Sequence, residues 1–131
     1  MTSSRTLVFI RALLLGICGL AIARCGSSPS SPSNGGNAPV TVSLTPTGPQ
    51  PTEVRIPVGG QVMFVNNDVR PHQMTSDPVT LHTDCPPIND VGTLAPGQSR
   101  MTGALTVART CGFHDHFNEF DDAWKGRIVV Q

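Results

Sequence analysis

The chain has 131 residues, of which 38% are hydrophobic and 14% are charged, with 13 glycines and 12 prolines. This length allows one ordinary domain, and the composition excludes a disordered protein and favours a fold with many turns over a helical one. The formal net charge is zero, but all nine acidic residues lie beyond residue 24, whereas three of the nine basic residues lie before residue 25. The sequence has no basic patch that would contact phosphates, so we do not expect nucleic acid as a partner.

Residues 1–24 are predicted to be a signal peptide. Residues 1–11 contain two arginines and no acidic residue, and residues 12–23 are apolar and uncharged. A positively charged N-terminal region followed by about a dozen apolar residues is typical of a secretory signal. The apolar segment is too short to span a bilayer comfortably. Ala21-Ile22-Ala23 has the A-x-A form of a cleavage site, which would release the chain before Arg24.

Residues 25–38 begin with Cys25 and are rich in serine, proline and glycine, a composition typical of a flexible tether. The apolar segment followed by Cys-Gly-Ser-Ser resembles bacterial lipoproteins, in which a cysteine directly after the signal is lipidated and becomes the first residue. The resemblance implies an exported domain in the periplasm or at the cell surface, anchored through Cys25, with this anchor as its membrane contact. Either cleavage site places the domain outside the cytoplasm.

Residues 39–131 are expected to form one all-β domain, beginning with two strands. Apolar residues alternate with others over residues 40–44 and 53–58, which is the period of a half-buried strand. Gly59-Gly60 favours a hairpin turn to a returning strand over Gln61 to Val65, because glycine adopts positive φ at little cost. The polar run at residues 66–68 marks the next turn.

The second half of the domain is expected to contain a long loop and two further strands. Residues 75–90 contain the pair Pro86-Pro87 and few apolar residues, which favours an irregular loop. Alternating Met101, Leu105 and Val107 favour a strand that starts near Ser99, and residues 126–130 close the chain as a final strand. No segment has a convincing amphipathic helical period.

Histidines and cysteines cluster in the second half of the domain in a way that indicates a metal site. His72 follows the polar turn, His82 and Cys85 lie in the long loop, and Cys111, His114 and His116 fall within six residues. Imidazole and thiolate are ligands that copper prefers. A Cys-x-x-His pair on a tight loop would place sulfur and nitrogen on one centre, and a distant histidine would complete a trigonal site.

The order of motifs resembles the plastocyanin and azurin family of small copper proteins, the cupredoxins. The resemblance covers nearly all of residues 53–131 and is carried by Val58-Gly59-Gly60-Gln61-Val62, Asn66-Asn67-Asp68, Pro71-His72-Gln73, residues 94–99, Cys111-Gly112-Phe113-His114 and residues 126–130. It implies a Greek-key β-sandwich that binds one copper ion through His72, Cys111 and His114. It also implies a one-electron carrier with a redox partner protein rather than an enzyme.

The sequence departs from this family at the position of the weak axial ligand. The family has a methionine there, four or five residues after the second histidine. Asn118 and Glu119 occupy those positions here. His116 is the more natural extra ligand, and His82 and Glu119 are additional candidates. These nitrogen and oxygen ligands would give a harder and more tetragonal metal site than sulfur ligands would.

The cysteines leave two alternatives open. In an oxidising compartment Cys85 and Cys111 can form a disulfide, which would remove the thiolate. The chain would then be a copper-binding or copper-delivery protein, with a copper donor or acceptor as partner and a metal site formed by His72, His114 and His116, with or without His82. The second alternative is an interaction module that keeps the fold and binds no metal.

Overall fold

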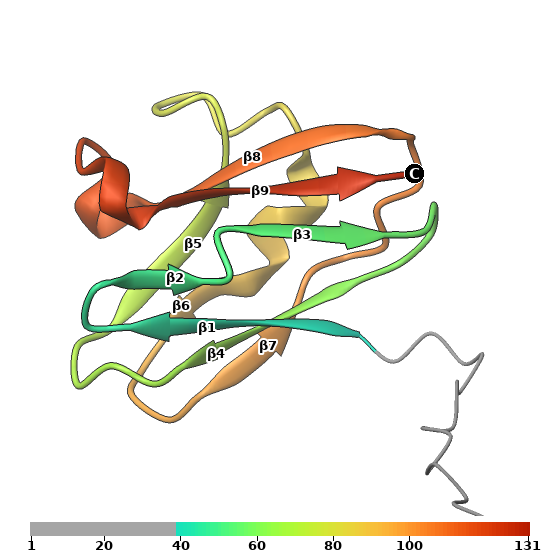
Figure 1. Ribbon diagram of the computed structural model, residues 1–131. Helices are drawn as coiled ribbons and strands as arrows, with labels where there is room; N and C mark the ends of the chain where they lie inside the picture. The colour runs from blue at the N-terminus through green and yellow to red at the C-terminus, as the bar shows by residue number, and fades with distance from the viewer. Residues whose placement is uncertain (1–38) are drawn as a thin grey trace, which may run out of the picture. The chain divides into compact units, whose positions relative to one another are not determined.

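The structure is a computed structural model that describes residues 39–131, and Figure 1 shows its course. The predicted signal peptide, the lipidation site Cys25 and the tether of residues 25–38 lie outside the described residues. Within residues 39–131, no helix is long and apolar enough to cross a membrane.

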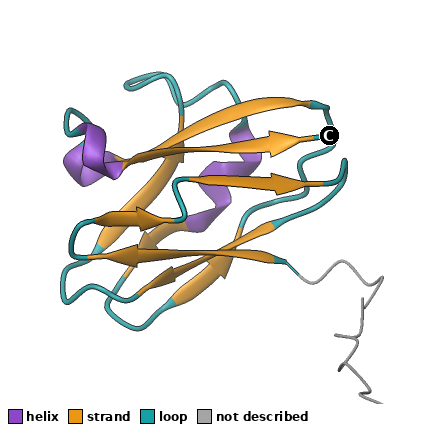
Figure 2. Ribbon diagram, viewed as in Figure 1, coloured by secondary structure: helices purple, strands orange, loops and turns teal. Residues whose placement is uncertain are grey.

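The described chain contains nine strands and three short 3-10 helices and no α-helix (Figure 2). The strands are β1 (Val40–Thr45), β2 (Gly48–Gln50), β3 (Glu53–Ile56), β4 (Val62–Asn66), β5 (His72–Ser76), β6 (Gly92–Leu94), β7 (Ser99–Met101), β8 (Arg109–Asp115) and β9 (Lys125–Val130). The 3-10 helices are η1 (Pro86–Val91), η2 (His116–Asn118) and η3 (Asp122–Trp124).

The strands form two sheets, one in the order β2-β1-β4-β7 and the other in the order β3-β9-β8-β5-β6. The pairs β1–β4 and β3–β9 are parallel, and the other paired strands are antiparallel. The sheets are joined by their apolar faces. Phe64 of the four-stranded sheet meets Phe113 of the five-stranded sheet edge to face, with ring centroids 5.1 Å apart. The expected all-β sandwich is therefore confirmed.

The core between the sheets is formed by inward-facing residues of both. The four-stranded sheet contributes Val42, Leu44, Val62 and Phe64, and the five-stranded sheet contributes Val54, Ile56, Met74, Leu94, Phe113, Ile128 and Val130. Ile88 and Val91 of η1 complete this core and are fully buried. Burial of such side chains is the main contribution to the stability of the fold, at about 1.5–3 kcal/mol for each large one.

Three local expectations differ from the structure. Gly59-Gly60 is not a hairpin turn, because β3 and β4 belong to different sheets and the glycines lie in the crossing between them. The strand expected from Ser99 to Val107 ends at Met101; Leu105 forms an isolated bridge with Gly60, and Val107 is exposed. The segment around Cys111 is not a tight loop but the regular strand β8.

Candidate metal centre

Four side chains with metal-binding atoms meet at one end of the five-stranded sheet. They are His82, His114, His116 and Glu119, and one potential ligand atom from each lies within 4.8 Å of the others. The ring of His82 lies 5.2 Å from that of His114 and 5.0 Å from that of His116, measured between centroids. We call these four residues the histidine–glutamate cluster.

Strand β8 places His114 on the outer face of the five-stranded sheet. Successive side chains of a strand point to opposite faces, so His114 points away from the face of its neighbour Phe113. Phe113 packs against the opposite sheet, and His114 therefore points away from the core. Its side chain is nevertheless fully buried, since residues of the 77–85 segment, which we call the 77–85 loop, cover it.

Gly112 makes room for a carboxylate beside His114. A Cβ atom at Gly112 would lie 2.0 Å from Oδ2 of Asp77, so this position allows no side chain. Oδ1 of Asp77 lies 2.7 Å from Nδ1 of His114. A carboxylate on one ring nitrogen orients a histidine and leaves the other nitrogen, here Nε2, to face a metal. Nε2 lies 3.1 Å from the hydroxyl oxygen of Thr75, a hydrogen bond that a metal would replace.

Two nitrogen atoms of the cluster have no hydrogen-bond partner among residues 39–131, although both are buried. They are Nε2 of His82 and Nδ1 of His116. The latter lies 3.4 Å from Oε2 of Glu119 but is not aligned with it for a hydrogen bond. Buried polar atoms in folded proteins are almost always satisfied, and an exception indicates a missing water or ion. The donor set thus fits a metal ion.

His82 has a strained backbone and a perturbed side chain. Its φ angle is +54°, in the left-handed region that few residues other than glycine adopt. Its amide donates to the carbonyl of Pro78 at 3.0 Å, and its carbonyl accepts from Nδ2 of Asn89 at 2.9 Å. Burial, followed by the positive charges that His114 and His116 can carry, lowers the pKa of His82. The neutral imidazole that binds metals is therefore favoured here.

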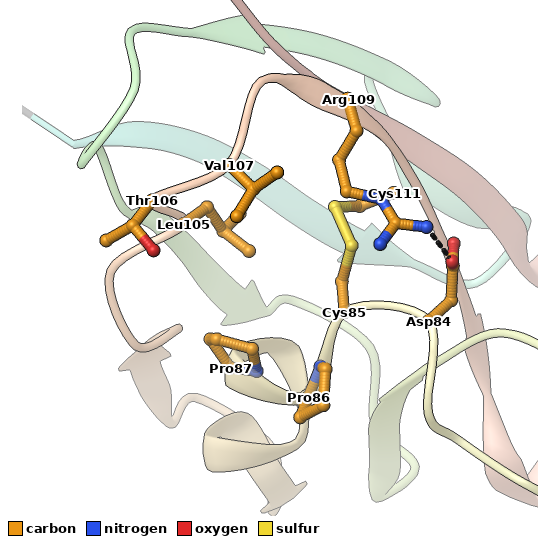
Figure 3. A pocket seen from close by; sticks show the side chains of 9 residues that line it. All are labelled: Asp84, Cys85, Pro86, Pro87, Leu105, Thr106, Val107, Arg109 and Cys111. Carbon is orange, nitrogen blue, oxygen red and sulfur yellow. Dashed lines mark hydrogen bonds and ion pairs between the residues drawn. A yellow bond between two sulfur atoms is a disulfide. The ribbon is translucent and has the colours of Figure 1, made fainter.

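Cys111 points into the core rather than toward the histidine–glutamate cluster. It is bonded to Cys85 in a disulfide, with the two Cα atoms 5.8 Å apart (Figure 3). Positions three apart on a strand lie on opposite faces, which separates Cys111 from His114. The structure therefore places Cys111 in the disulfide of the alternative prediction and not beside His114 as a thiolate ligand.

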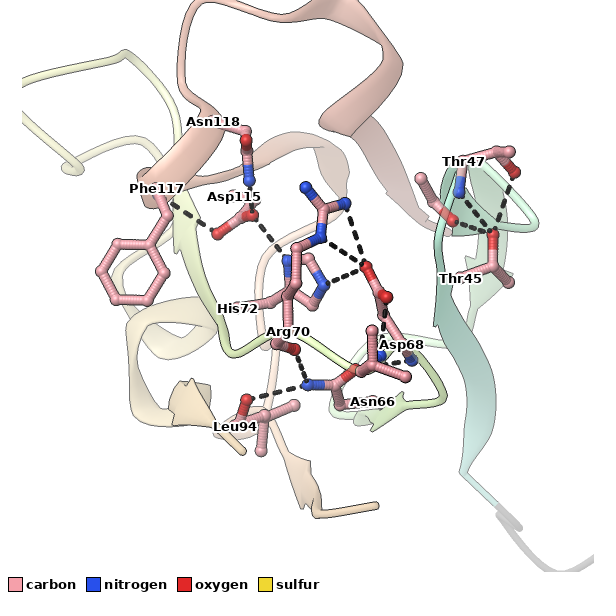
Figure 4. A network of polar contacts seen from close by, with 12 residues as sticks. Thr45, Thr47, Asn66, Asp68, Arg70, His72, Leu94, Asp115, Phe117 and Asn118 are labelled. Carbon is pink, nitrogen blue, oxygen red and sulfur yellow. Dashed lines mark hydrogen bonds and ion pairs between the residues drawn. The ribbon is translucent and has the colours of Figure 1, made fainter. Parts of the chain in front are cut away.

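His72 also faces the core and belongs to a separate polar network, shown in Figure 4. Its Nδ1 lies 2.8 Å from Oδ2 of Asp115, and its Nε2 lies 3.1 Å from Oδ2 of Asp68. Its ring stacks on Trp124 at a centroid distance of 4.2 Å, and Arg70 lies over the same indole at 5.5 Å. The structure therefore places His72, which was predicted as a metal ligand, between two carboxylates and outside the histidine–glutamate cluster.

The two carboxylates of this network are well supplied with hydrogen bonds. Asp115 accepts from the amides of Gln73 and Phe117 and from the side chain of Asn118. Burial acts to raise the pKa of Asp68, but hydrogen bonds from the Val69 amide, Arg70 and His72 outweigh it, so that the pKa is lowered. The network therefore holds a carboxylate on each side of an imidazole, which is a structural arrangement rather than an open ligand site.

Comparison with known proteins identifies the fold. No protein-family model matches the chain, and no curated protein matches it. The purple cupredoxin from Nitrosopumilus maritimus matches with a TM-score of 0.54 at 16% identity, over 70% of this chain and 99% of that one. The chain has the cupredoxin fold. Amicyanin from Paracoccus versutus matches with a TM-score of 0.57 at 18% identity, over 78% of this chain and 86% of amicyanin. A reduced mutant of amicyanin matches with a TM-score of 0.56 at 20% identity, over 71% of this chain and 82% of the mutant.

This cupredoxin-fold domain distributes the predicted ligands in an unexpected way. The structure brings together His114, His116, His82 and Glu119, of which the last two were additional candidates. It places His72 and Cys111 on the other face of the sheet. Asp77 was not predicted as a site residue, and no spacing indicates it. A glycine inside a strand, such as Gly112, is a sign of close approach by another group and could have directed attention to it.

Proposed function

We propose that this chain is a copper-binding protein whose single metal site is the histidine–glutamate cluster. The observation that carries the proposal is the pair of buried nitrogen atoms without hydrogen-bond partners, Nε2 of His82 and Nδ1 of His116, within the described domain. Three imidazoles and one carboxylate are nitrogen and oxygen donors of the kind that Cu(II) takes in tetragonal sites. Cu(II) also binds such donors more tightly than the other common divalent ions do.

The residues around the cluster support this role. Asp77 fixes the orientation of His114, and Glu119 supplies a negative charge beside His116. When bound, copper would supply a centre that changes between two oxidation states. With Cys111 in a disulfide, its ligands in this site include no sulfur.

Titration with Cu(II), followed by electron paramagnetic resonance, tests the proposal. We expect one equivalent to bind with nitrogen couplings from imidazoles, and affinity to fall in His82→Ala and His116→Ala. Asp122→Asn is a suitable control, because Asp122 is exposed and its partner is Lys125, outside the cluster. Unchanged affinity in both histidine variants would refute the site.

One-electron transfer is a second candidate function, favoured by the position of His116. Its side chain is 39% exposed, so an imidazole edge of the cluster reaches the surface, as a carrier requires. Structures of amicyanin mutants that share this fold include an oxidised form and Cu(I) forms. Reversible voltammetry of the copper-loaded chain, and its loss in His116→Ala, would support the proposal of a carrier with a redox partner. A protein that binds copper but does not cycle would instead be a binding or delivery protein.

We further propose that the domain acts outside the cytoplasm, anchored through Cys25. The signal-like residues 1–24 support this location. So does the disulfide, since disulfides persist in oxidising compartments. Mass spectrometry of the mature N-terminus tests the anchor, and a product that begins at Arg24 without lipid would contradict it.

A further inference from the structure

The 77–85 loop is joined to strand β8 from both sides of the sheet. On the core side, Cys85 is bonded to Cys111. On the outer side, the ring of His82 lies against that of His114. His82 lies three positions before Cys85, and His114 lies three positions after Cys111. The covalent bond and the cluster therefore connect the same two short segments.

We propose that the Cys85–Cys111 disulfide and the metal site are coupled, so that reduction of the disulfide weakens metal binding. The inference rests on the proposed metal site at the histidine–glutamate cluster. By thermodynamic reciprocity, bound metal then makes the disulfide harder to reduce by the same factor. The chain would bind its metal under oxidising conditions and release it when a reductant reaches the domain.

His82 depends on its surroundings for its position. A non-glycine residue at a φ of +54° persists only where neighbouring contacts hold it. His82 itself is held by its hydrogen bonds with Pro78 and Asn89. The hydrogen bonds next to Cys85 are Asp84 N to Asp77 O at 2.8 Å, Cys85 N to the Ser76 hydroxyl at 3.3 Å and Ile88 N to Cys85 O at 3.0 Å. A further tie, between Asp84 and Arg109, is at the surface, where ion pairs contribute little. The disulfide is the one covalent constraint on this turn within residues 39–131.

A pocket gives a small reductant a path to the disulfide. Both cysteine side chains are buried, but a cavity of about 230 Å³ is lined by them and by Pro86, Pro87, Leu105 and Val107 (Figure 3). The proposed reductant is a dithiol. One of its thiolates attacks a sulfur of the disulfide to form a mixed disulfide, and its second thiol then displaces the protein. Two electrons and two protons pass to Cys85 and Cys111, and the dithiol leaves as a disulfide.

Metal affinity without the disulfide is the first test. Cu(II) affinity of the full chain is compared with that of Cys85→Ala/Cys111→Ala by competition with a chelator, and circular dichroism shows whether the variant is folded. We expect affinity to fall roughly 5- to 150-fold, the usual range of coupling between sites. Added to a His82→Ala background, the same two substitutions should change affinity little, because the coupling acts through His82.

Reduction of the unaltered chain tests the same coupling without any variant. The chain is equilibrated with dithiothreitol and its disulfide, with free Zn(II) set by a chelator, because Zn(II) has no redox chemistry of its own. We expect saturating Zn(II) to lower the reduced fraction. A higher reduced fraction would overturn the proposal and indicate that the released thiolates bind the metal. Equal reduced fractions with and without Zn(II) would also overturn the proposal. So would unchanged Cu(II) affinity in a folded Cys85→Ala/Cys111→Ala variant. Failure of the unaltered chain to bind either metal would instead refute the proposed function itself.

Discussion

His72 and His114 lie on opposite faces of the five-stranded sheet, although they belong to adjacent strands. Thr75 is paired with His114 across β5 and β8, so these two side chains share the outer face. His72 is three positions from Thr75 on β5 and therefore faces the core. The sheet thus separates a structural histidine from a histidine that can bind a metal.

The copper-loaded chain should absorb weakly in the visible range. The proposed ligands include no thiolate, so no intense sulfur-to-copper band is expected. Titration of the folded chain should find no free thiol at Cys85 or Cys111. A strongly coloured protein with Cys85 free would contradict the disulfide and restore Cys111 as a ligand.

Loss of the disulfide should lower stability as well as metal affinity. Cys85 and Cys111 are 26 residues apart in sequence. For a loop of this size, the model-dependent chain-entropy estimate is on the order of 3 kcal/mol. Urea unfolding of Cys85→Ala/Cys111→Ala measures this loss in free energy, with Asp122→Asn as the control.

Replacement of His72 should destabilise the fold and leave the metal site in place. The side chain is fully buried between Asp68 and Asp115, and its removal takes a hydrogen-bond partner from each of these buried carboxylates. A buried polar group left without its hydrogen-bond partner costs about 1–3 kcal/mol. Urea unfolding of His72→Ala measures this cost, and copper stoichiometry is measured on the fraction that remains folded. Lost copper binding with unchanged stability would return His72 to the ligand set.

Replacement of Asp77 should weaken metal binding with a small effect on stability. Asp77 holds Nδ1 of His114, and loss of such a supporting carboxylate costs about 10- to 100-fold in metal affinity. Chelator competition with Asp77→Asn measures the change. Asp84→Asn is a matched control, since Asp84 lies in the same loop but pairs with Arg109. Equal affinities in the two variants would show that Asp77 does not orient the ligand.

Gly112→Ala should weaken metal binding through Asp77. The added Cβ would lie 2.0 Å from Oδ2 and 2.8 Å from Cγ of Asp77, so the carboxylate must move. In an Asp77→Ala background these two atoms are absent and the nearest remaining side-chain atom is Cβ at 3.2 Å. The Gly112→Ala substitution should therefore cost much less affinity and stability in that background. Equal costs in both backgrounds would show that the contact with Asp77 is not the reason for the glycine.

The stability of the metal-free chain should decrease in acid partly through Asp68. The pKa of Asp68 is lower in the folded chain than its ordinary value of 3.8. Such a carboxylate stabilises the fold above the unfolded value, and this contribution is lost as pH falls through the folded value. Unfolding free energies of the parent chain and of Asp68→Asn should therefore converge as pH falls below 3.8. A gap between them that stays constant into acid would contradict this assignment.

The all-β class, the positions of β1, β3, β4 and β9, and the histidines and carboxylate of the histidine–glutamate cluster could be predicted from the amino-acid sequence alone. Alternation along a strand is local and can be read from neighbouring residues. Which of these side chains meet depends on how the strands pair in the folded chain. The Cys-x-x-His spacing is compatible with one centre if residues 111–114 form a tight turn, and with opposite faces if they form a strand. Pairing with β5 and β9 selects the strand, because those hydrogen bonds form only when distant segments are brought together. For the same reason Cys111 reaches Cys85 in the core while His114 meets His82 on the outer face.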